Sequence, residues 1–116
     1  MNELLEIGIF QFENLVRGRV PFALLKVSGD VSQLFLSYLQ EPLDRNTFDV
    51  TADSLMAFVE EKKFTKDQAF VVACADGTKS PALAQTLFNL GFGNVYYLKE
   101  GTTALREYLK PNSPKA

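Results

Sequence analysis

The sequence predicts a single α/β domain with a mainly parallel central sheet covered by helices on both faces. Strands are predicted at residues 22–27 (FALLKV), 69–74 (AFVVAC) and 94–98 (NVYYL), and segments with helical periodicity lie between and after them. The middle run is apolar throughout, which is typical of a central strand buried on both faces. Strands that alternate with helices favour parallel pairing, because each crossover returns the chain to the same edge of the sheet.

The clearest helix is predicted at residues 81–90, between two well-marked ends. Ser80 suits the N-cap, Pro81 suits the first helical position because it lacks an N–H, and Gly91 suits the left-handed C-terminal cap. One apolar stripe of this helix is predicted to face the core: Leu83, Ala84, Leu87 and Phe88.

Four more helices are predicted at residues 11–17, 30–40, 52–63 and 103–109. The second of them is expected to end before Pro42, because the residue preceding a proline disfavours helical geometry. The third is expected to be capped by Thr51 or Asp53. Four of its residues are predicted to face the core: Leu55, Met56, Phe58 and Val59.

Length and composition describe one ordinary globular domain. The chain has 116 residues, of which 47% are hydrophobic and 22% charged, so it can build one core and leaves little room for extensive disorder. We expect one domain over residues 1–110 and a loose tail over residues 111–116, which contain two prolines. The net charge of −2, without a basic stripe or a long apolar run, argues against nucleic-acid and membrane partners.

Residue usage restricts the chemistry further. The chain contains no histidine, which excludes His-based acid–base catalysis and argues against a metal site. Its one cysteine, Cys74, cannot form an intramolecular disulfide, which fits a reducing compartment. Residues 1–12 carry Glu3 and Glu6 and no positively charged n-region, so we expect no signal peptide and a cytoplasmic location.

The loop after Cys74 is the main candidate for chemistry. A buried strand is predicted to end at Cys74 and a helix to begin six residues later, which aims the unpaired amides of the helix N-terminus at the cysteine. Gly77 lets the loop curl so that its amides converge. Such amides stabilise a thiolate, which is the nucleophilic form of cysteine. Lys79 adds a positive charge that Asp76 partly opposes.

A structural role for Cys74 is the competing interpretation. A cysteine at the end of an apolar strand is more often an inert core residue. The glycine-containing loop and the capped helix that follow favour a functional role, because a structural cysteine requires neither.

The segment CADGTKS, followed by LFNLGF and GNVYYL, resembles the rhodanese-like domain family. Members of that family place a cysteine after a central strand, then a loop that is typically C-x-x-G-x-R-S, then a helix ending in Leu-x-x-x-Gly-Phe. Cys74, Gly77 and Ser80 stand at the matching positions. The resemblance is specific over about residues 70–101, and over residues 22–70 it is an order of elements.

Some positions depart from the family pattern. Lys79 stands where the family usually has Arg, and Lys26-Val27-Ser28 stands in place of Asp-Val-Arg. No Gly-His-Ile-Pro-Gly-Ala-like stretch follows Ser28. Glu100-Gly101 replaces a Gly-Gly turn, and the tryptophan often found after that turn is absent.

The resemblance implies a sulfurtransferase that needs no metal or organic cofactor. In it, the Cys74 thiolate takes the outer sulfur of a small anionic donor such as thiosulfate and passes it to an external thiol, on a small molecule or protein, or to another nucleophile. Lys79 and Thr78 would contact the donor, and the loop amides would hold the persulfide anion. The substrate-binding residues implied in this way are Ala75, Asp76, Gly77, Thr78, Lys79 and Ser80.

Two alternatives stay open at this point. Asp76, Lys79 and the missing Asp-Val-Arg favour a non-enzymatic binding or regulatory module with the same fold. A cysteine phosphatase is disfavoured, because its phosphate-binding loop is one residue longer and ends in Arg, whose planar fork Lys79 cannot replace.

Overall fold

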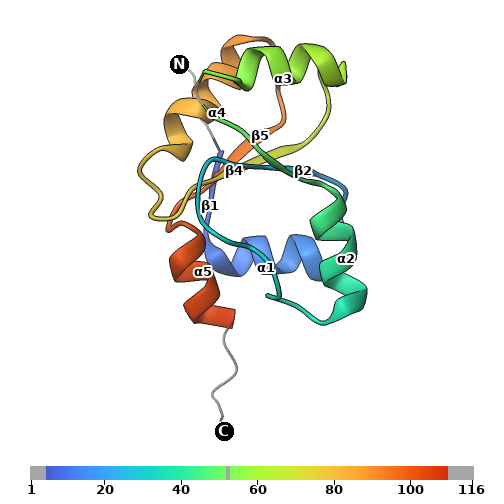
Figure 1. The fold of residues 1–116 in the computed structure, drawn as a ribbon, viewed down its shortest axis with the longest axis vertical. Coiled ribbons are helices and arrows are strands. Elements are labelled where there is room, and N and C mark those ends of the chain that lie inside the picture. Colours follow the sequence, from blue (N-terminus) through green and yellow to red (C-terminus); the bar gives the residue numbers. More distant parts are fainter. Residues whose placement is uncertain (1–4, 52, 110–116) are drawn as a thin grey trace, which may run out of the picture.

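Five parallel strands form the centre of the molecule, in the spatial order β1-β5-β4-β2-β3 (Figure 1). The computed structural model describes residues 5–51 and 53–109. The strands are β1 (Leu5–Ile7), β2 (Ala23–Lys26), β3 (Thr47–Asp49), β4 (Phe70–Ala73) and β5 (Val95–Leu98). The predicted parallel sheet is therefore confirmed, with the apolar run of β4 at its centre.

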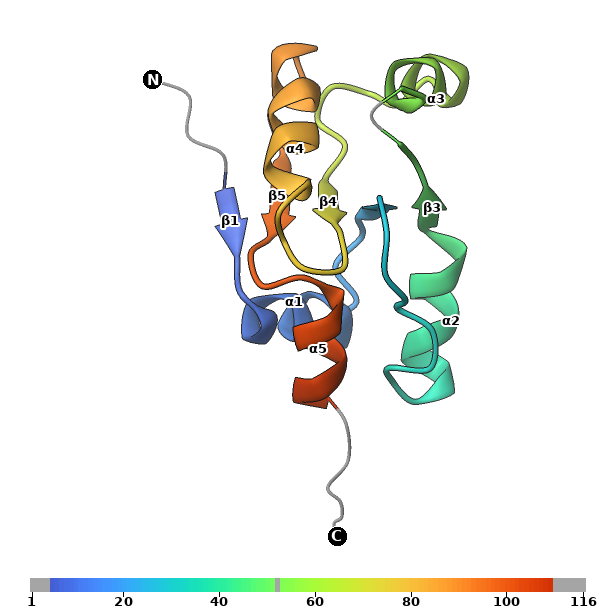
Figure 2. The same cartoon turned by 60° about the vertical axis from the view of Figure 1, so that its left-hand side comes forward.

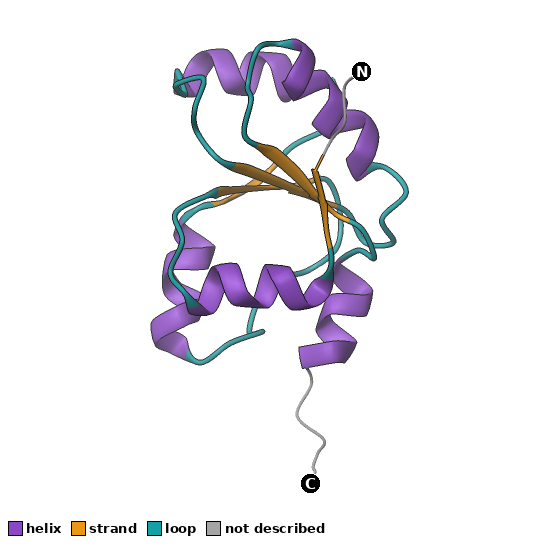
Figure 3. Ribbon diagram, turned by 180° about the vertical axis from the view of Figure 1, so that it is seen from behind, coloured by secondary structure: helices purple, strands orange, loops and turns teal. Residues whose placement is uncertain are grey.

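Helices cover both faces of the sheet, as the sequence predicts. Figures 1 and 3 show α3 (Leu55–Lys62) and α4 (Ser80–Asn89) on one face, opposite the other three helices. The second layer consists of α1 (Ile9–Arg17), α2 (Ser37–Arg45) and α5 (Thr102–Leu109). In the part of the chain that the structure describes, no helix is both long enough and apolar enough to cross a membrane.

Strand β4 holds the two layers together because both of its faces are buried. Its side chains alternate, so that Val71 and Ala73 join the core beneath α1, α2 and α5. Phe70 and Val72 join the core beneath α3 and α4. Continuation of this alternation directs Cys74, the next residue after β4, toward the α3 and α4 side.

The C-terminus of α4 confirms the predicted glycine cap, whereas its N-terminus does not follow the prediction. Gly91 has φ +103° and the N–H of Phe92 donates to the Leu87 carbonyl at 3.3 Å, as in a Schellman motif. Ser80 is not the N-cap: Lys79 takes that position, and Ser80 and Pro81 are the first two helical residues. The start differs by one residue because the Lys79 amide turns to the Cys74 sulfur and closes the loop there.

The helix predicted at residues 30–40 is wrong. Helix α2 begins at Ser37 and continues through Pro42. The cause is Gln40, whose side-chain oxygen accepts the Leu34 and Phe35 amides at 2.8 and 3.0 Å. These bonds satisfy backbone groups outside a helix, so the preceding segment stays irregular.

Smaller differences concern element ends. The three-residue edge strands β1 and β3 were not predicted, and α1 and α5 begin two residues and one residue before their expected starts. Helix α3 begins at Leu55, after a turn in which the Thr51 hydroxyl accepts the Ser54 amide at 3.1 Å. The predicted start at Ala52 and the tail at residues 111–116 lie outside the described residues.

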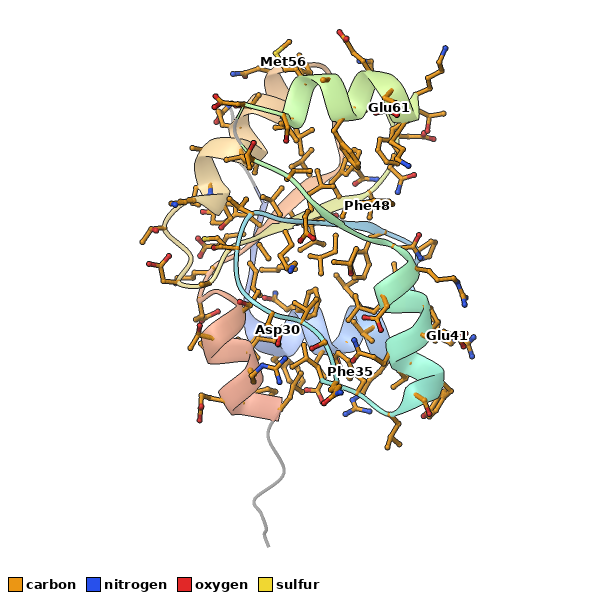
Figure 4. All side chains as sticks on the ribbon, in the orientation of Figure 1. Asp30, Phe35, Glu41, Phe48, Met56 and Glu61 are labelled. Carbon is orange, nitrogen blue, oxygen red and sulfur yellow. The ribbon has the colours of Figure 1, made fainter. Side chains whose placement is uncertain are left out.

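Met56 was predicted to face the core and does not. It is 51% exposed and lies on the outer side of α3 (Figure 4), whereas Leu55 and Val59 are buried and Phe58 is half-buried. The stripe of α4 is as expected: Leu83, Ala84 and Leu87 are buried and Phe88 is half-buried.

We predict that Phe70→Ala lowers the free energy of unfolding by about 3–5 kcal/mol, the usual cost of removing a buried aromatic ring. The Phe70 ring is fully buried and packs in T-shaped geometry against the rings of Phe64 and Phe92. Urea unfolding followed by circular dichroism measures the loss. Phe10, which is 63% exposed, supplies the matched control, and Phe10→Ala should stay within about 0.5 kcal/mol of the parent.

Candidate functional site

Cys74 lies at the carboxyl end of the central strand, where parallel α/β sheets usually bind their ligands. The loop of residues 75–79 leads from it into α4. The residue is fully buried. A reagent or substrate therefore reaches the sulfur only when the loop or its neighbours move.

The loop after Cys74 is held by the chain that enters α5, and Figure 2 shows the two segments side by side. The Thr102 amide donates to the Cys74 carbonyl at 2.9 Å, and the Thr103 amide donates to the Ala75 carbonyl at 3.0 Å. These two bonds fix the backbone at Cys74 and at the residue that follows it.

Two glycines make this close approach feasible. Gly77 has φ +84°, and a Cβ there would collide with the Lys99 carbonyl oxygen. Gly101 has φ +94°, and a Cβ there would lie 2.5 Å from the Ala75 carbonyl oxygen. Neither position accepts a larger side chain without moving the backbone of the other segment.

The Cys74 sulfur has two polar neighbours with opposite effects. The Lys79 amide donates to Sγ at 3.2 Å, and an N–H donor at a helix N-terminus stabilises a thiolate. The thiol also faces Oδ1 of Asp76 at 3.8 Å, and a nearby carboxylate stabilises the protonated form. The sulfur therefore lies between a backbone N–H donor and a carboxylate oxygen.

Asp76 is held in place by Thr78. The Thr78 hydroxyl donates to Oδ1 at 2.7 Å and the Thr78 amide donates to the same oxygen at 3.1 Å. These bonds, the hydroxyl first, keep the pKa of Asp76 below its usual range, so the carboxylate is ionised at neutral pH. The Thr78 hydroxyl is thus engaged by Asp76 in this conformation and is not directed at a donor.

The ammonium groups of Lys79 and Lys26 differ in their binding partners. The Lys79 side chain is exposed, and its ammonium makes no ion pair with any carboxylate in residues 5–51 and 53–109. The Lys26 ammonium is bound to Asp49 at 3.0 Å and to the Gly29 carbonyl at 3.1 Å. Of these two lysines, Lys79 is the one free to attract an anion.

Sequence reasoning assigned no role to Ser28, although it noted the residue as a departure from the family pattern. The Ser28 hydroxyl accepts the Ala75 amide at 3.0 Å, which ties the end of β2 to the loop. The position of Ser28 in the sequence could have indicated this contact, because Ser28 follows β2 and β2 pairs directly with β4. As a result, the Ala75 amide is occupied within the protein and does not point freely at the sulfur.

Two buried hydroxyl groups close to this loop make no hydrogen bond with the described residues. They belong to Ser80, at the start of α4, and Thr102, at the start of α5. The Thr102 hydroxyl fills the space where a Cβ of Gly29 would lie, which explains the glycine at φ +91°. An unpaired buried hydroxyl costs about 1–3 kcal/mol, so such groups commonly bind a water or a ligand atom.

The predicted site residues lie on one continuous segment, from Cys74 after β4 to Ser80, the first residue of α4. The sequence placed them there, but the bonding differs in detail: side chains occupy the Ala75 and Thr78 amides, and the Lys79 amide reaches the sulfur. Ser80 is buried rather than exposed to substrate. The roles of these residues in binding stay predictions.

Comparisons with known proteins agree with this geometry. The family model of the rhodanese-like domain matches residues 28–108. The chain is 37% identical over 60 residues to the thiosulfate sulfurtransferase GlpE of Vibrio cholerae, a match that covers 52% of this chain and 55% of that protein. The matched chain therefore spans about half the length of that relative.

Solved structures with low sequence identity share the fold. A rhodanese-related protein from Thermoplasma volcanium superposes with a TM-score of 0.63 at 18% identity, covering 92% of this chain and 95% of that one. A protein of unknown function from Rhodopseudomonas palustris, described as a possible tyrosine phosphatase, superposes with a TM-score of 0.69 at 18% identity, covering 93% and 83%. At this identity the two structures support the fold alone.

We predict that Gly77→Ala destabilises the domain by about 1–3 kcal/mol, the usual cost of a left-handed residue held against a steric conflict. The same change should increase the rate at which a thiol reagent modifies Cys74, because the loop must move away from the Lys99 carbonyl. Urea unfolding and the alkylation rate measure the two effects. Gly93→Ala is the control, since a Cβ at Gly93 meets nothing within 4 Å; equal behaviour of the two variants would contradict the prediction.

Proposed function

The chain belongs to the rhodanese-like domain family, and on that basis we propose that it is a sulfurtransferase that carries sulfur as a persulfide on Cys74. The observation that supports this most directly is the 3.2 Å hydrogen bond from the Lys79 amide to the Cys74 sulfur. That amide belongs to the N-cap of a ten-residue helix, where the partial positive charge of the helix is concentrated.

The proposed reaction has two steps in which the atoms balance. The Cys74 thiolate attacks the outer sulfur of an anionic donor such as thiosulfate, the sulfur–sulfur bond of the donor breaks, and sulfite leaves with the electron pair. An acceptor thiolate then attacks the outer sulfur of the persulfide and releases the Cys74 thiolate. Cys74 is the only cysteine in the chain, so the acceptor is external.

The surroundings of the sulfur supply the groups that this reaction needs. The Lys79 amide contacts the sulfur directly, and the hydroxyls of Ser80 and Thr102, which have no partner among the described residues, are buried at the starts of α4 and α5. The unpaired Lys79 ammonium attracts the anionic donor. A free thiol in this role suits a reducing compartment such as the cytoplasm.

A second candidate function is a non-enzymatic binding or regulatory module. Two observations favour it: Cys74 is fully buried, and the Asp76 carboxylate lies 3.8 Å from its sulfur. At about 4 Å two like charges repel by about 1 kcal/mol even at the dielectric of water. A persulfide anion therefore forms more readily when Asp76 moves away.

We predict that the purified protein, incubated with thiosulfate, gains the mass of one sulfur atom and that Cys74→Ser does not. Intact-mass spectrometry before and after reduction measures the gain, which reductant should reverse. Uptake that persists in Cys74→Ser would contradict the assignment of Cys74. No uptake by the parent, with intact folding, favours the binding module.

We further predict that Lys79→Ala raises the thiosulfate concentration needed for half-maximal uptake about fivefold, as expected from a charge contact worth about 1 kcal/mol at a solvated rim. Lys79→Arg should preserve or improve uptake by a few-fold, because a guanidinium can contact two donor oxygens. Lys62→Ala removes the same charge from α3 and is the control. If Lys79→Ala behaves like this control, the donor binds elsewhere.

A further inference from the structure

The Asp76 carboxylate is a charged group in direct contact with the Cys74 sulfur. Its Oδ1 atom lies 3.8 Å from Sγ, on the loop that leads into α4. Within residues 5–51 and 53–109, the other polar contact of Sγ is the Lys79 amide at 3.2 Å, which carries no formal charge. The formal charge in contact with the sulfur is therefore negative.

The charge of Asp76 is fixed beside the thiol and has no counter-ion among the described residues. The groups that hold its carboxylate are neutral donors, the hydroxyl and the amide of Thr78, at 2.7 and 3.1 Å. These bonds, the hydroxyl first, hold the pKa of Asp76 below its usual range, so the carboxylate keeps its charge at neutral pH. A donor that reaches the sulfur therefore meets a negative charge that no ion pair neutralises.

Positive charges near this loop act at other points. The Lys26 ammonium is paired with Asp49 at 3.0 Å. The Lys79 side chain is exposed, and the hydrogen bond that Lys79 makes to the sulfur comes from its amide. Because an interaction between charges weakens with distance and is screened in solvent, Lys79 attracts anions toward the loop, whereas Asp76 acts on an anion that has reached the sulfur.

We propose that Asp76 is a specificity-determining residue, which makes the Cys74 site prefer sulfur donors with one negative charge to the thiosulfate dianion. This selectivity presupposes the sulfur transfer proposed above and names its substrate class, thiosulfonate-type donors R–SO₂–S⁻, in which an uncharged group replaces one charged oxygen of thiosulfate. The Cys74 thiolate attacks the outer sulfur of the donor, the sulfur–sulfur bond breaks, and the sulfinate R–SO₂⁻ leaves with the electron pair. One negative charge arrives with the donor and one leaves with the sulfinate, so the persulfide anion keeps the charge of the thiolate.

The second charge of thiosulfate adds to the repulsion by Asp76. Two like charges in water repel enough to lower a rate about fivefold at about 4 Å and about threefold at about 6 Å. This second charge lies on the sulfonate oxygens, two bonds beyond the outer sulfur. The dianion is therefore disfavoured by about threefold more than a monoanion of the same shape.

Alkylation of the thiol tests the charge selectivity without sulfur transfer. Iodoacetate and iodoacetamide add groups of nearly the same size and differ by one negative charge, and Cys74 is the only thiol in the chain. Both rates depend on the same thiolate fraction, so their ratio isolates the effect of the reagent's charge. Asp76→Asn should raise the ratio of the iodoacetate rate to the iodoacetamide rate about three- to fivefold at low ionic strength. Asp76→Ser is the substitute if Asp76→Asn does not fold.

Asp67 supplies a matched control on the segment before β4. Its Oδ1 atom accepts the Thr65 hydroxyl at 2.7 Å, as Oδ1 of Asp76 accepts the hydroxyl of Thr78. Asp67→Asn changes the net charge equally and should leave the ratio within about 1.5-fold of the parent, because the separation from the sulfur screens its effect. A ratio unchanged by Asp76→Asn, or an equal rise in Asp67→Asn, would overturn the proposal.

Sulfur uptake by Cys74 then tests the donor class, with intact mass as the readout and methanethiosulfonate and thiosulfate as the donors. Asp76→Asn should lower the ratio of the methanethiosulfonate rate to the thiosulfate rate about threefold, because loss of the carboxylate benefits the dianion more. An unchanged ratio of uptake rates would refute the role of Asp76 in donor selection. If neither donor adds sulfur to the parent or to Asp76→Asn, the sulfurtransferase function and the donor class fail together, and the alkylation ratio still decides whether Asp76 imposes charge selectivity.

Discussion

The close contact between two backbone segments, residues 74–77 and 99–103, determines the arrangement of the candidate site. The amides of Thr102 and Thr103 hold the carbonyls of Cys74 and Ala75, and Gly77 lies against the Lys99 carbonyl. This contact sets where the loop can go after β4. It therefore also places the Lys79 amide against the sulfur. The candidate site is therefore the anchored turn as a whole rather than the cysteine alone.

The loop carries one acidic and one basic side chain, and the backbone amide at the start of α4 adds a direct contact to the sulfur. Lys79 and Asp76 carry opposite charges on the same short loop, and Thr78 keeps the carboxylate close by. The amide at the start of α4 is a fixed dipole and does not depend on either side chain. In the proposed reaction, stabilisation of the persulfide anion would therefore rely first on the helix N-terminus, and Lys79 would act mainly on the approach of the donor.

The sequence predicted the parts of the fold that have strong local signals. The apolar run of β4 and the stripe of α4 identify the central strand and the helix after Cys74. Strands β1 and β3 escaped prediction because each has three residues at a sheet edge, too short for a periodic pattern. The prediction of a helix at residues 30–40 failed because the Gln40 side chain binds the Leu34 and Phe35 amides, and helix propensity does not report such a side-chain contact to the backbone.

Prediction of the candidate site from the sequence is likewise limited to features that have a local pattern. The loop could be located from Cys74 and Gly77, whereas the parts played by Ser28 and Thr102 depend on contacts across 47 residues or between α5 and the turn at Gly29. The environment of Cys74 also depends on the sheet as a whole. Val71 and Ala73 join the core beneath α1, whereas Phe70 and Val72 join the core beneath α3 and α4. Because successive residues of β4 alternate between two covered faces, the strand directs Cys74 toward the α3 and α4 layer, and that placement depends on helices that lie far from Cys74 in the sequence.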